Sequence, residues 1–406
     1  MNKLINIITS VIFVLFIAVI SVSFWIVDDV RFSDEESRSL TAFPKFSAER
    51  LTSGDFSADM QEYYMDQFPQ RGLFTGINSA AKMLVFGENN GILLGERGQL
   101  AVRLFQMYQS RRERTPDMDY YYEDNVRISL EGLNAFAQAQ SRPLATILPP
   151  RTVDVAASAF SYPTEISDAL WSLIGQTLTP ETGYIDMLPV FREKYENGDY
   201  VYMRTDHHWT TYGAYLAYAK LMQTWDMEDK ILPIDAFSVE SIPNFFGTSY
   251  SKARLNQVTP DTLELWTLGN DTEFMTTCYA SKQSKDEQGN TVITKEPYLS
   301  FPSWLNRDYL SQRNKYAAFL DSTHNEQTVF KNNAQDEQRQ RLLIAKDSFA
   351  NTMVPFLAQH FDLVIINLAG GITSLSSYAE EYGCDRILIV YNYANLIENN
   401  HLASVK

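Results

Sequence analysis

The chain has 406 residues, of which 45% are hydrophobic, and it carries a formal net charge of −16 with a pI near 4.8. This length and apolar content are enough to bury a sizeable core in one large domain or two, which excludes an intrinsically disordered protein. The acidic balance argues against a nucleic-acid partner, because phosphate binding needs clustered Lys and Arg.

The chain opens with an apolar segment, residues Leu4 to Val27, which is uncharged. As a helix it spans roughly 36 Å, more than the ~30 Å hydrocarbon core of a bilayer. It is longer than the ~7 to 15 residue core of a signal peptide, which favours an uncleaved single-pass anchor over a cleaved signal. Lys3 before it and Asp28 and Asp29 after it predict that residues 1–27 form a cytoplasmic tip and anchor at the cell membrane, with the rest extracytoplasmic.

Residues 28–124 are predicted to form a stalk and an accessory region. Within it, the stretch Phe86 to Gly98 combines an Asn-Gly turn, a short apolar strand and a second glycine turn, which is typical of a β-hairpin. A phosphate-binding loop is not expected there, because no Gly-Lys-Ser or Gly-Lys-Thr is present.

Residues 125–406 alternate between near-continuous apolar runs and helical patterns. Strands are predicted for Leu144–Leu148, for a run from Arg341 into Ser348, for Phe361–Leu368 and for Arg386–Asn392. Helices are predicted for Leu130–Gln140, Asp168–Leu178, Tyr215–Trp225 and Met353–His360. Together these patterns predict a three-layer α/β domain with a mainly parallel sheet, interrupted by a polar β-hairpin inserted at about residues 255–316.

The densest chemistry lies in the stretch Asp206-His207-His208-Trp209, which holds two of the five histidines. The helix that follows is predicted to be capped by Thr210 or Thr211, so the stretch lies just before its N-terminus. In an extended segment residues i and i+2 point the same way, so Asp206 and His208 are expected to face a common target.

Ser348 is predicted to stand at the carboxyl end of a parallel strand, where sites gather on such sheets. The N–H of Phe349 is the obvious oxyanion donor beside it. His208 is a candidate general base for this serine, with Asp206 holding the imidazole tautomer.

Structural alternatives compete with this interpretation. The two histidines are also suited to fixing a turn through buried hydrogen bonds, and Ser348 to capping a helix. The triplet Asp206-His207-His208 is also found in metal-dependent phosphoesterases, but no histidine precedes His207 to complete a ligand set, so no metal or cofactor is predicted. Cys278 and Cys384 do not form a disulfide framework, although their pairing is left open.

These motifs carry a family resemblance. The run Asp206-His207-His208-Trp209, with Phe245 to Lys252 downstream, Lys346 to Phe349 later and the Asn90 to Gly95 turn upstream, resembles the bacterial DHHW family. That family is similar to the SGNH-hydrolase-like O-acetyltransferases that modify alginate, with the serine placed after the Asp-x-His-Trp motif as in a circular permutation.

Carried over by position, the resemblance implies Ser348 as nucleophile, His208 as general base and Asp206 as its partner, with His207 outside the triad. His207 and Trp209 are further substrate-binding candidates. Where relatives tend to carry a glycine-rich oxyanion turn, this chain has Asp321-Ser322-Thr323. The candidates for oxyanion donors are therefore Phe349 N–H, Asn325 and Asn392.

The resemblance implies serine-dependent O-acetyl transfer to a cell-surface or exported polysaccharide through an acetyl-serine intermediate. It also implies a membrane-bound O-acyltransferase partner that delivers the acetyl group. Two alternatives stay open: a carbohydrate esterase (deacetylase), and a non-catalytic glycan-binding protein on the same fold. The 23 tyrosines suit stacking on sugar rings in each case.

Overall fold

The structure is a computed structural model that describes residues 2–33, 38–103, 118–161, 165–255, 258–285, 291–332, 339–370 and 374–405. Part of the predicted accessory region, residues 104–117, thus lies outside the described residues. The chain divides into two compact units, Met1–Asn90 with Tyr250–Val258, and Gly91–Ser249 with Thr259–Lys406. The domain boundaries proposed above stay predictions.

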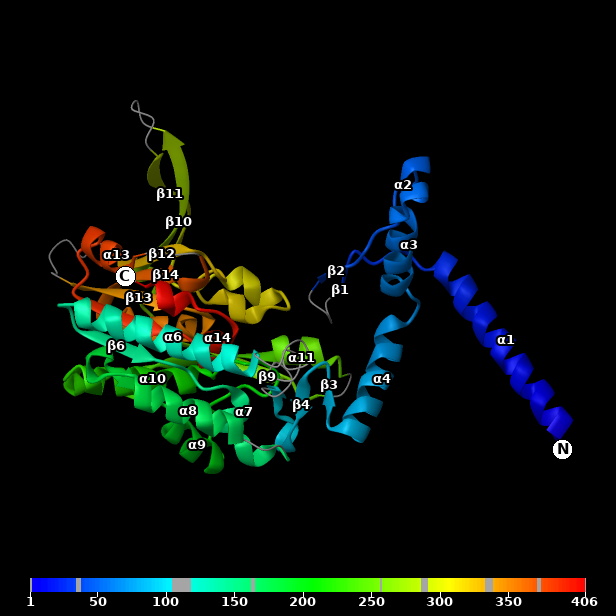
Figure 1. Ribbon diagram of the computed structural model, residues 1–406, viewed down its shortest axis with the longest axis horizontal. Coiled ribbons are helices and arrows are strands. Elements are labelled where there is room, and N and C mark those ends of the chain that lie inside the picture. The colour runs from blue at the N-terminus through cyan, green and yellow to red at the C-terminus, as the bar shows by residue number, and fades with distance from the viewer. Residues whose placement is uncertain are drawn as a thin grey trace. The chain divides into compact units, whose positions relative to one another are not determined.

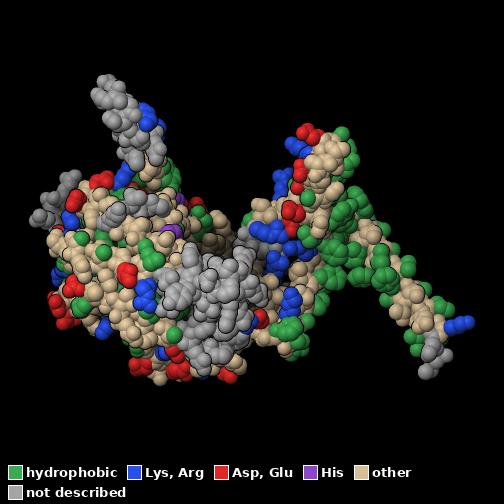
Figure 2. Space-filling model, in the orientation of Figure 1, with side chains coloured by type: hydrophobic (Ala, Val, Ile, Leu, Met, Phe, Trp, Pro, Cys, Tyr) green, Lys and Arg blue, Asp and Glu red, His purple; other side chains and the backbone are tan. Residues whose placement is uncertain are grey.

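The first unit consists mainly of helices (Figure 1). Its elements are α1 (Asn2–Ile26), β1 (Phe32–Ser33), β2 (Arg38–Ser39), α2 (Ala48–Ser53), α3 (Asp55–Asp66), α4 (Arg71–Phe86) and β3 (Glu88–Asn89). Residues Lys3–Ile26 of α1 have a mean hydropathy of 2.8 and are not buried, so α1 is long and apolar enough to cross a membrane. Hydrophobic side chains gather along it in Figure 2.

The second unit is built on an eight-stranded mixed sheet, ordered β11-β10-β12-β14-β13-β15-β6-β7. The strands from β14 to β7 pair in parallel, and β12, β10 and β11 extend the sheet in antiparallel fashion. Their bounds are β6 (Leu144–Ile147), β7 (Tyr184–Ile185), β10 (Phe274–Lys285), β11 (Thr291–Pro302), β12 (Glu326–Lys331), β13 (Gln340–Lys346), β14 (Phe361–Asn367) and β15 (Arg386–Val390). The predicted α/β class and mainly parallel sheet are confirmed.

The apolar character of the central strands follows from burial on both faces. Along β13, Leu342 and Ile344 enter one apolar core while Leu343 and Ala345 enter another, because alternate side chains of a strand point to opposite faces. Helices cover both faces (Figure 1). Those of the second unit are α6 (Met118–Ala139), α7 (Thr152–Val155), α8 (Glu165–Thr177), α9 (Leu188–Glu196), α10 (Thr211–Thr224), α12 (Val354–Leu357), α13 (Leu375–Glu381) and α14 (Tyr393–Glu398), while α11 (Thr248–Ala253) spans the boundary between the units.

The inserted hairpin is present as strands β10 and β11. It does not stand apart from the sheet, because β10 also pairs with β12 from Phe274 to Tyr279. The second unit also contains two smaller antiparallel pairs: β4 (Ile92–Leu94) with β5 (Leu100–Val102), and β8 (Ser238–Phe245) with β9 (Asp261–Thr267).

One predicted helix is shorter than expected. Only Val354–Leu357 of the predicted Met353–His360 helix is α-helical, and it follows a 3₁₀ segment from Ser348 to Met353. Pro355 lies in the first turn of α12, where its missing N–H leaves no hydrogen bond unmade. Proline favours the start of a helix at this position over the continuation of one. Ser348 therefore lies in a tight 3₁₀ turn at the end of β13.

The two cysteines do not form a disulfide. Cys278 and Cys384 are both free and buried. Burial raises the pKa of both thiols, that of Cys384 to about 11, so both are held as unreactive thiols.

Candidate active site

The stretch from Arg204 to Thr210 forms a narrow loop before α10. Met203 N–H donates to the carbonyl of His208 at 3.2 Å, and Thr210 N–H donates to that of Val201 at 2.9 Å. Thr210 then caps α10, because its hydroxyl accepts from Gly213 N–H at 3.1 Å, as the sequence predicted.

The buried carboxylate of Asp261 holds this loop in place through hydrogen bonds. Asp261 accepts the backbone N–H groups of Arg204 and Thr205, each at 2.8 Å, and the Thr205 hydroxyl at 2.5 Å. Since Asp261 is fully buried, these bonds both satisfy its charge and fix the residues that precede Asp206.

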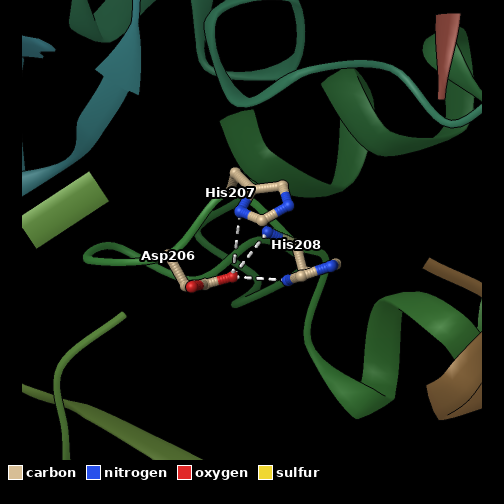
Figure 3. A group of neighbouring side chains, drawn as sticks. All are labelled: Asp206, His207 and His208. Atoms are coloured by element: carbon tan, nitrogen blue, oxygen red, sulfur yellow. Dashed lines mark hydrogen bonds and ion pairs between the residues drawn. The ribbon is translucent and has the colours of Figure 1, made fainter. Parts of the chain in front are cut away.

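Asp206, His208 and Ser348 form one continuous hydrogen-bonded series. The Nδ1 atom of His208 lies 2.6 Å from Oδ1 of Asp206, and its Nε2 atom lies 2.7 Å from Oγ of Ser348. Figure 3 shows the Asp206 carboxylate facing His208 from the same loop. Asp206 and His208 are buried and Ser348 is half-buried, so the hydroxyl is the member of the series nearest to solvent.

Asp206 is ionised despite its burial. Burial by itself raises the pKa of this carboxyl, but the His207 and His208 imidazoles and a backbone hydrogen bond from Thr248 hold it well below its usual range. Thr248 N–H donates to Oδ2 of Asp206 at 2.8 Å, and its hydroxyl donates to the same oxygen at 3.2 Å. The carboxylate can therefore stabilise a positive charge on His208.

Gly247 makes room for this carboxylate. A Cβ atom at position 247 would lie 2.2 Å from both Cβ and Oδ2 of Asp206. The glycine is needed for the close approach, which places Thr248 N–H on the carboxylate. The Phe245 to Lys252 motif thus contributes to the site through Gly247 and Thr248, whose roles the sequence did not specify.

Ser348 follows β13, between β14 and β15 at the carboxyl edge of the parallel strands. Asp347 caps the 3₁₀ turn, because its Oδ1 accepts Phe349 N–H at 3.0 Å. Its Oδ2 accepts Asn392 N–H at 2.6 Å and the Asn395 amide at 2.9 Å. Asp347, rather than Ser348, is thus the N-cap, which leaves the serine hydroxyl to His208.

Two of the predicted oxyanion donors are engaged elsewhere. Phe349 N–H is bonded to Asp347, and the Asn392 amide donates to the carbonyl of Pro149 at 3.0 Å while its oxygen caps α14. The side chain of Asn325 lies against Gly370, since a Cβ there would meet its Oδ1 at 2.7 Å. In this conformation none of these three groups is directed at Ser348 by a hydrogen bond in the described structure.

Trp209 and Tyr316 pack around Ser348 and His208 and do not extend into solvent. Trp209 is fully buried, and its indole N–H donates to the carbonyl of Phe349 at 3.0 Å and to Thr352 Oγ1 at 2.8 Å. This corrects its expected place as a substrate contact. Tyr316, which sequence analysis missed, stacks on His208 with ring centroids 4.1 Å apart and donates to the Ser348 carbonyl at 2.9 Å.

His207 occupies a different environment from its neighbour. Its side chain is 40% exposed, and Nδ1 lies 2.7 Å from the Thr248 hydroxyl. Candidate ligand atoms of Asp206, His207 and His208 lie within 4.8 Å of one another, which is close enough for a metal (Figure 3). Both nitrogens of His208 already have hydrogen-bond partners, however, so coordination would require one of these bonds to break.

The loop that contains Asp321 and Ser322 has an unusual backbone conformation. Leu320, Asp321 and Ser322 have φ values of 59°, 56° and 75°, a left-handed conformation that ordinary residues rarely adopt consecutively. The Asn351 amide donates to Ser322 O at 3.5 Å, and Asn351 Oδ1 accepts from Lys346 Nζ at 2.6 Å. The loop is thus connected to the end of β13, beside Ser348.

The sequence comparison matches this region. Residues 181–367 match the family described as DHHW protein. The resemblance to the DHHW family is confirmed. The matched residues include Asp206, His208, Thr248 and Ser348. A search among curated proteins found no match.

Solved structures resemble the chain at low identity. A DHHW family protein from Eubacterium siraeum is 20% identical with a TM-score of 0.53, covering 69% of this chain and 88% of that one. PatB1 from Bacillus cereus is 23% identical with a TM-score of 0.52, covering 68% and 91%. A second PatB1 structure, with a sulfonyl adduct, is 22% identical with a TM-score of 0.54, covering 70% and 94%. These likenesses establish the fold and confirm the predicted SGNH-like class.

Proposed function

We propose that this protein is an acyl-transferring serine enzyme in which Ser348 is the nucleophile, His208 the general base and Asp206 its orienting partner. The observation that carries the proposal is the unbroken series from Asp206 Oδ1 to Ser348 Oγ, with both links at 2.6 to 2.7 Å. A nucleophile bonded to a base that is itself oriented by a carboxylate is the arrangement that activates serine hydroxyls.

The chemistry consists of two matched transfers. Ser348 Oγ attacks the acetyl carbonyl while His208 Nε2 takes its proton, and the bond from the acetyl carbon to the donor oxygen breaks as His208 protonates that oxygen. A sugar hydroxyl then loses its proton to His208 and attacks the acetyl-serine, and Ser348 Oγ regains the proton. Asp206 stays ionised and stabilises the imidazolium in both halves.

The acceptor and the donor follow from the family resemblance and from α1. We propose a polysaccharide hydroxyl as acceptor, and a membrane-bound O-acyltransferase as the partner that delivers the acetyl group. The apolar helix α1 favours transfer over hydrolysis, because a secreted esterase gains little from an anchor. We also propose that the catalytic unit is extracytoplasmic, since Lys3 lies in the first turn of α1, and Asp28 and Asp29 follow the helix.

The decisive experiment traps the intermediate. Full-length protein in detergent is incubated with an activated acetyl ester, and the peptide containing Ser348 is examined by mass spectrometry for an added acetyl group. A sulfonyl fluoride should modify the same serine, since sulfonyl groups trap nucleophilic hydroxyls. Ser348→Ala and His208→Ala should abolish both reactions, whereas Ser172→Ala, at an exposed serine of α8, should change neither. Equal labelling of Ser348→Ala would overturn the proposal.

Glycan chemistry separates the proposed transfer from its two alternatives. Deleting the gene should lower O-acetylation of a cell-surface or exported glycan. A rise in acetylation would show a deacetylase. No change in acetylation or ester turnover, with glycan binding retained, would show a non-catalytic protein.

A further inference from the structure

The first unit exposes apolar side chains on a folded helix. In α4, Leu73, Ile77, Ala80 and Leu84 recur at spacings of four, three and four, which places them on one face. That face is exposed, and Leu84 is 88% accessible. The residues of α4 that are buried are instead Gly76, Ser79 and Met83. An amphipathic helix in water is expected to show the opposite arrangement.

A second apolar feature adjoins this face. A groove of about 890 Å³ runs along α2, α3 and the start of α4. Aromatic, aliphatic and methionine side chains make up most of its lining, namely Leu51, Phe56, Met60, Tyr64, Met65, Phe68 and Phe74. We call this groove together with the exposed face of α4 the apolar shelf. Exposed patches of this kind on a folded unit mark a binding surface.

The apolar shelf is fastened to the end of the apolar helix α1. Tyr63 of α3 donates to Asp29 Oδ1 at 2.8 Å, and the Gln67 side chain both accepts from and donates to the backbone of Val30 at 2.9 Å. The ring of Phe24 in α1 packs on Tyr63 and Tyr64, with centroids 5.7 and 4.9 Å apart. These contacts tie α3 to residues within four positions of Ile26, where α1 ends.

The contact continues from α3 to α4. Phe16 of α1 meets Phe74 of α4 edge to face, with centroids 6.3 Å apart. The exposed apolar surfaces of α1 and the shelf therefore adjoin within one unit, and hydrophobic side chains gather on both in Figure 2. An environment that surrounds α1 therefore also contacts the apolar shelf.

We propose that the apolar shelf binds the lipid bilayer that α1 crosses, so that α3 and α4 form a membrane-embedded platform rather than a free stalk. Lipid is favoured over a second copy or a protein partner because the shelf is held beside the membrane helix by contacts within its own chain. Apolar helix faces of this kind are stabilised when they are buried among the headgroups and acyl chains of a bilayer. The proposal requires α1 to be a membrane anchor but does not depend on the chemistry at Ser348.

The test measures lipid contact in the full-length chain. Single cysteines are introduced by Ile77→Cys and Leu84→Cys on the exposed apolar face, and by Asn78→Cys and Lys82→Cys at exposed polar positions on the other side of α4 as matched controls. Both native cysteines are buried. Wild-type protein, which has no introduced cysteine, is treated in the same way to correct for any labelling of these two residues. Each variant is labelled with an environment-sensitive fluorophore and reconstituted into vesicles of phosphatidylethanolamine and phosphatidylglycerol.

We expect blue-shifted emission at positions 77 and 84, strong quenching there by nitroxide phospholipids, and protection from aqueous acrylamide. Positions 78 and 82 should show the reverse. Equal acrylamide quenching at all four positions would overturn the proposal. Protection that persists in detergent and disappears on dilution would assign the shelf to a second copy, and protection in native membranes but not in vesicles would assign it to a protein partner. Both results would also overturn it, and none depends on ester turnover.

Discussion

The loop around His208 and the helix α4 differ in which side chains they bury: the loop buries polar groups, and α4 exposes apolar ones. The loop buries ionisable groups, and both oxygens of Asp206 and both nitrogens of His208 have hydrogen-bond partners. Helix α4 buries Gly76 and Ser79 and leaves Leu84 exposed. Burying an unpaired polar group and exposing an apolar one both cost free energy in water. The first region is therefore complete within the chain, whereas the second needs a neighbour outside it.

The largest expected effect tests whether the loop is complete. Asp206→Asn should lower kcat for ester turnover by about 10⁴-fold, because the amide no longer selects the His208 tautomer that accepts the Ser348 proton. Asp235→Asn, at an exposed aspartate of the same unit, is the control. Steady-state kinetics with an activated acetyl ester provide the measurement. A loss smaller than tenfold would show that the carboxylate is not part of the catalytic unit.

The close approach of Gly247 to Asp206 leaves no space for a larger residue. Gly247→Ala should lower kcat by about 10²-fold, because the new methyl group would displace the Asp206 carboxylate by an ångström or more. Gly175→Ala, in α8 with nothing within 4 Å of the added Cβ, should leave activity unchanged. Comparable activity in the two variants would show that the loop tolerates displacement.

Lys346 is a buried basic residue two positions before Ser348, and burial lowers its pKa to about 8. Between that value and its unfolded pKa of about 10.4, the unfolded chain binds more protons, so stability should rise with pH by up to about 1.4 kcal/mol per unit. Below about pH 8 the burial penalty is fully present. Thermal unfolding is measured at pH 7.5 and 9.5 for the wild type and for Lys346→Met. The stability of the wild type relative to the variant should be higher at pH 9.5 than at pH 7.5. If the relative stability of the wild type instead fell between these pH values, Lys346 would be buried as a stabilised cation.

The two adjacent histidines of the loop are expected to differ in their importance for activity. His207→Ala should fold and keep most activity, with kcat falling less than about tenfold, because His207 is part exposed and bonds Thr248 rather than Ser348. Its kcat is compared with that of His208→Ala under the same conditions. If both variants are equally inactive, the assignment of His208 as the general base is wrong.

The smallest expected effect concerns metal. Chelator treatment of the full-length protein should leave ester turnover unchanged, because both His208 nitrogens are engaged by Asp206 and Ser348. Turnover before and after chelation is the measurement. Activity that is lost and then restored by zinc or manganese would favour a metal site at Asp206, His207 and His208.

Features written locally in the sequence were predictable. The apolar runs of β13, β14 and β15 and the Thr210 cap of α10 follow from residue periodicity and capping chemistry alone. The pairing of Asp206 with His208 was also accessible, because the two residues lie on one extended segment.

Contacts between distant segments were not predictable. Nothing in the spacing of Asp261 or Tyr316 indicates that one lies under the Asp206 loop and the other stacks on His208. The engagement of Phe349 N–H is a different case, since an aspartate before a helical turn, here Asp347, commonly accepts that donor. The burial of Trp209 was missed because a motif residue does not reveal whether its indole N–H finds an acceptor inside the fold.

The inserted hairpin leaves the sheet with a long outer strand, since β11 spans Thr291–Pro302 at one end of the strand order. Such a strand is a template for aggregation when its backbone groups can recruit a second chain. Pro297 has no N–H to offer, and Lys295 and Glu296 place charges beside it. The neighbouring strand also has a register shift between Cys278 and Tyr279. The chain therefore extends its sheet without presenting a flat edge along which copies would polymerise.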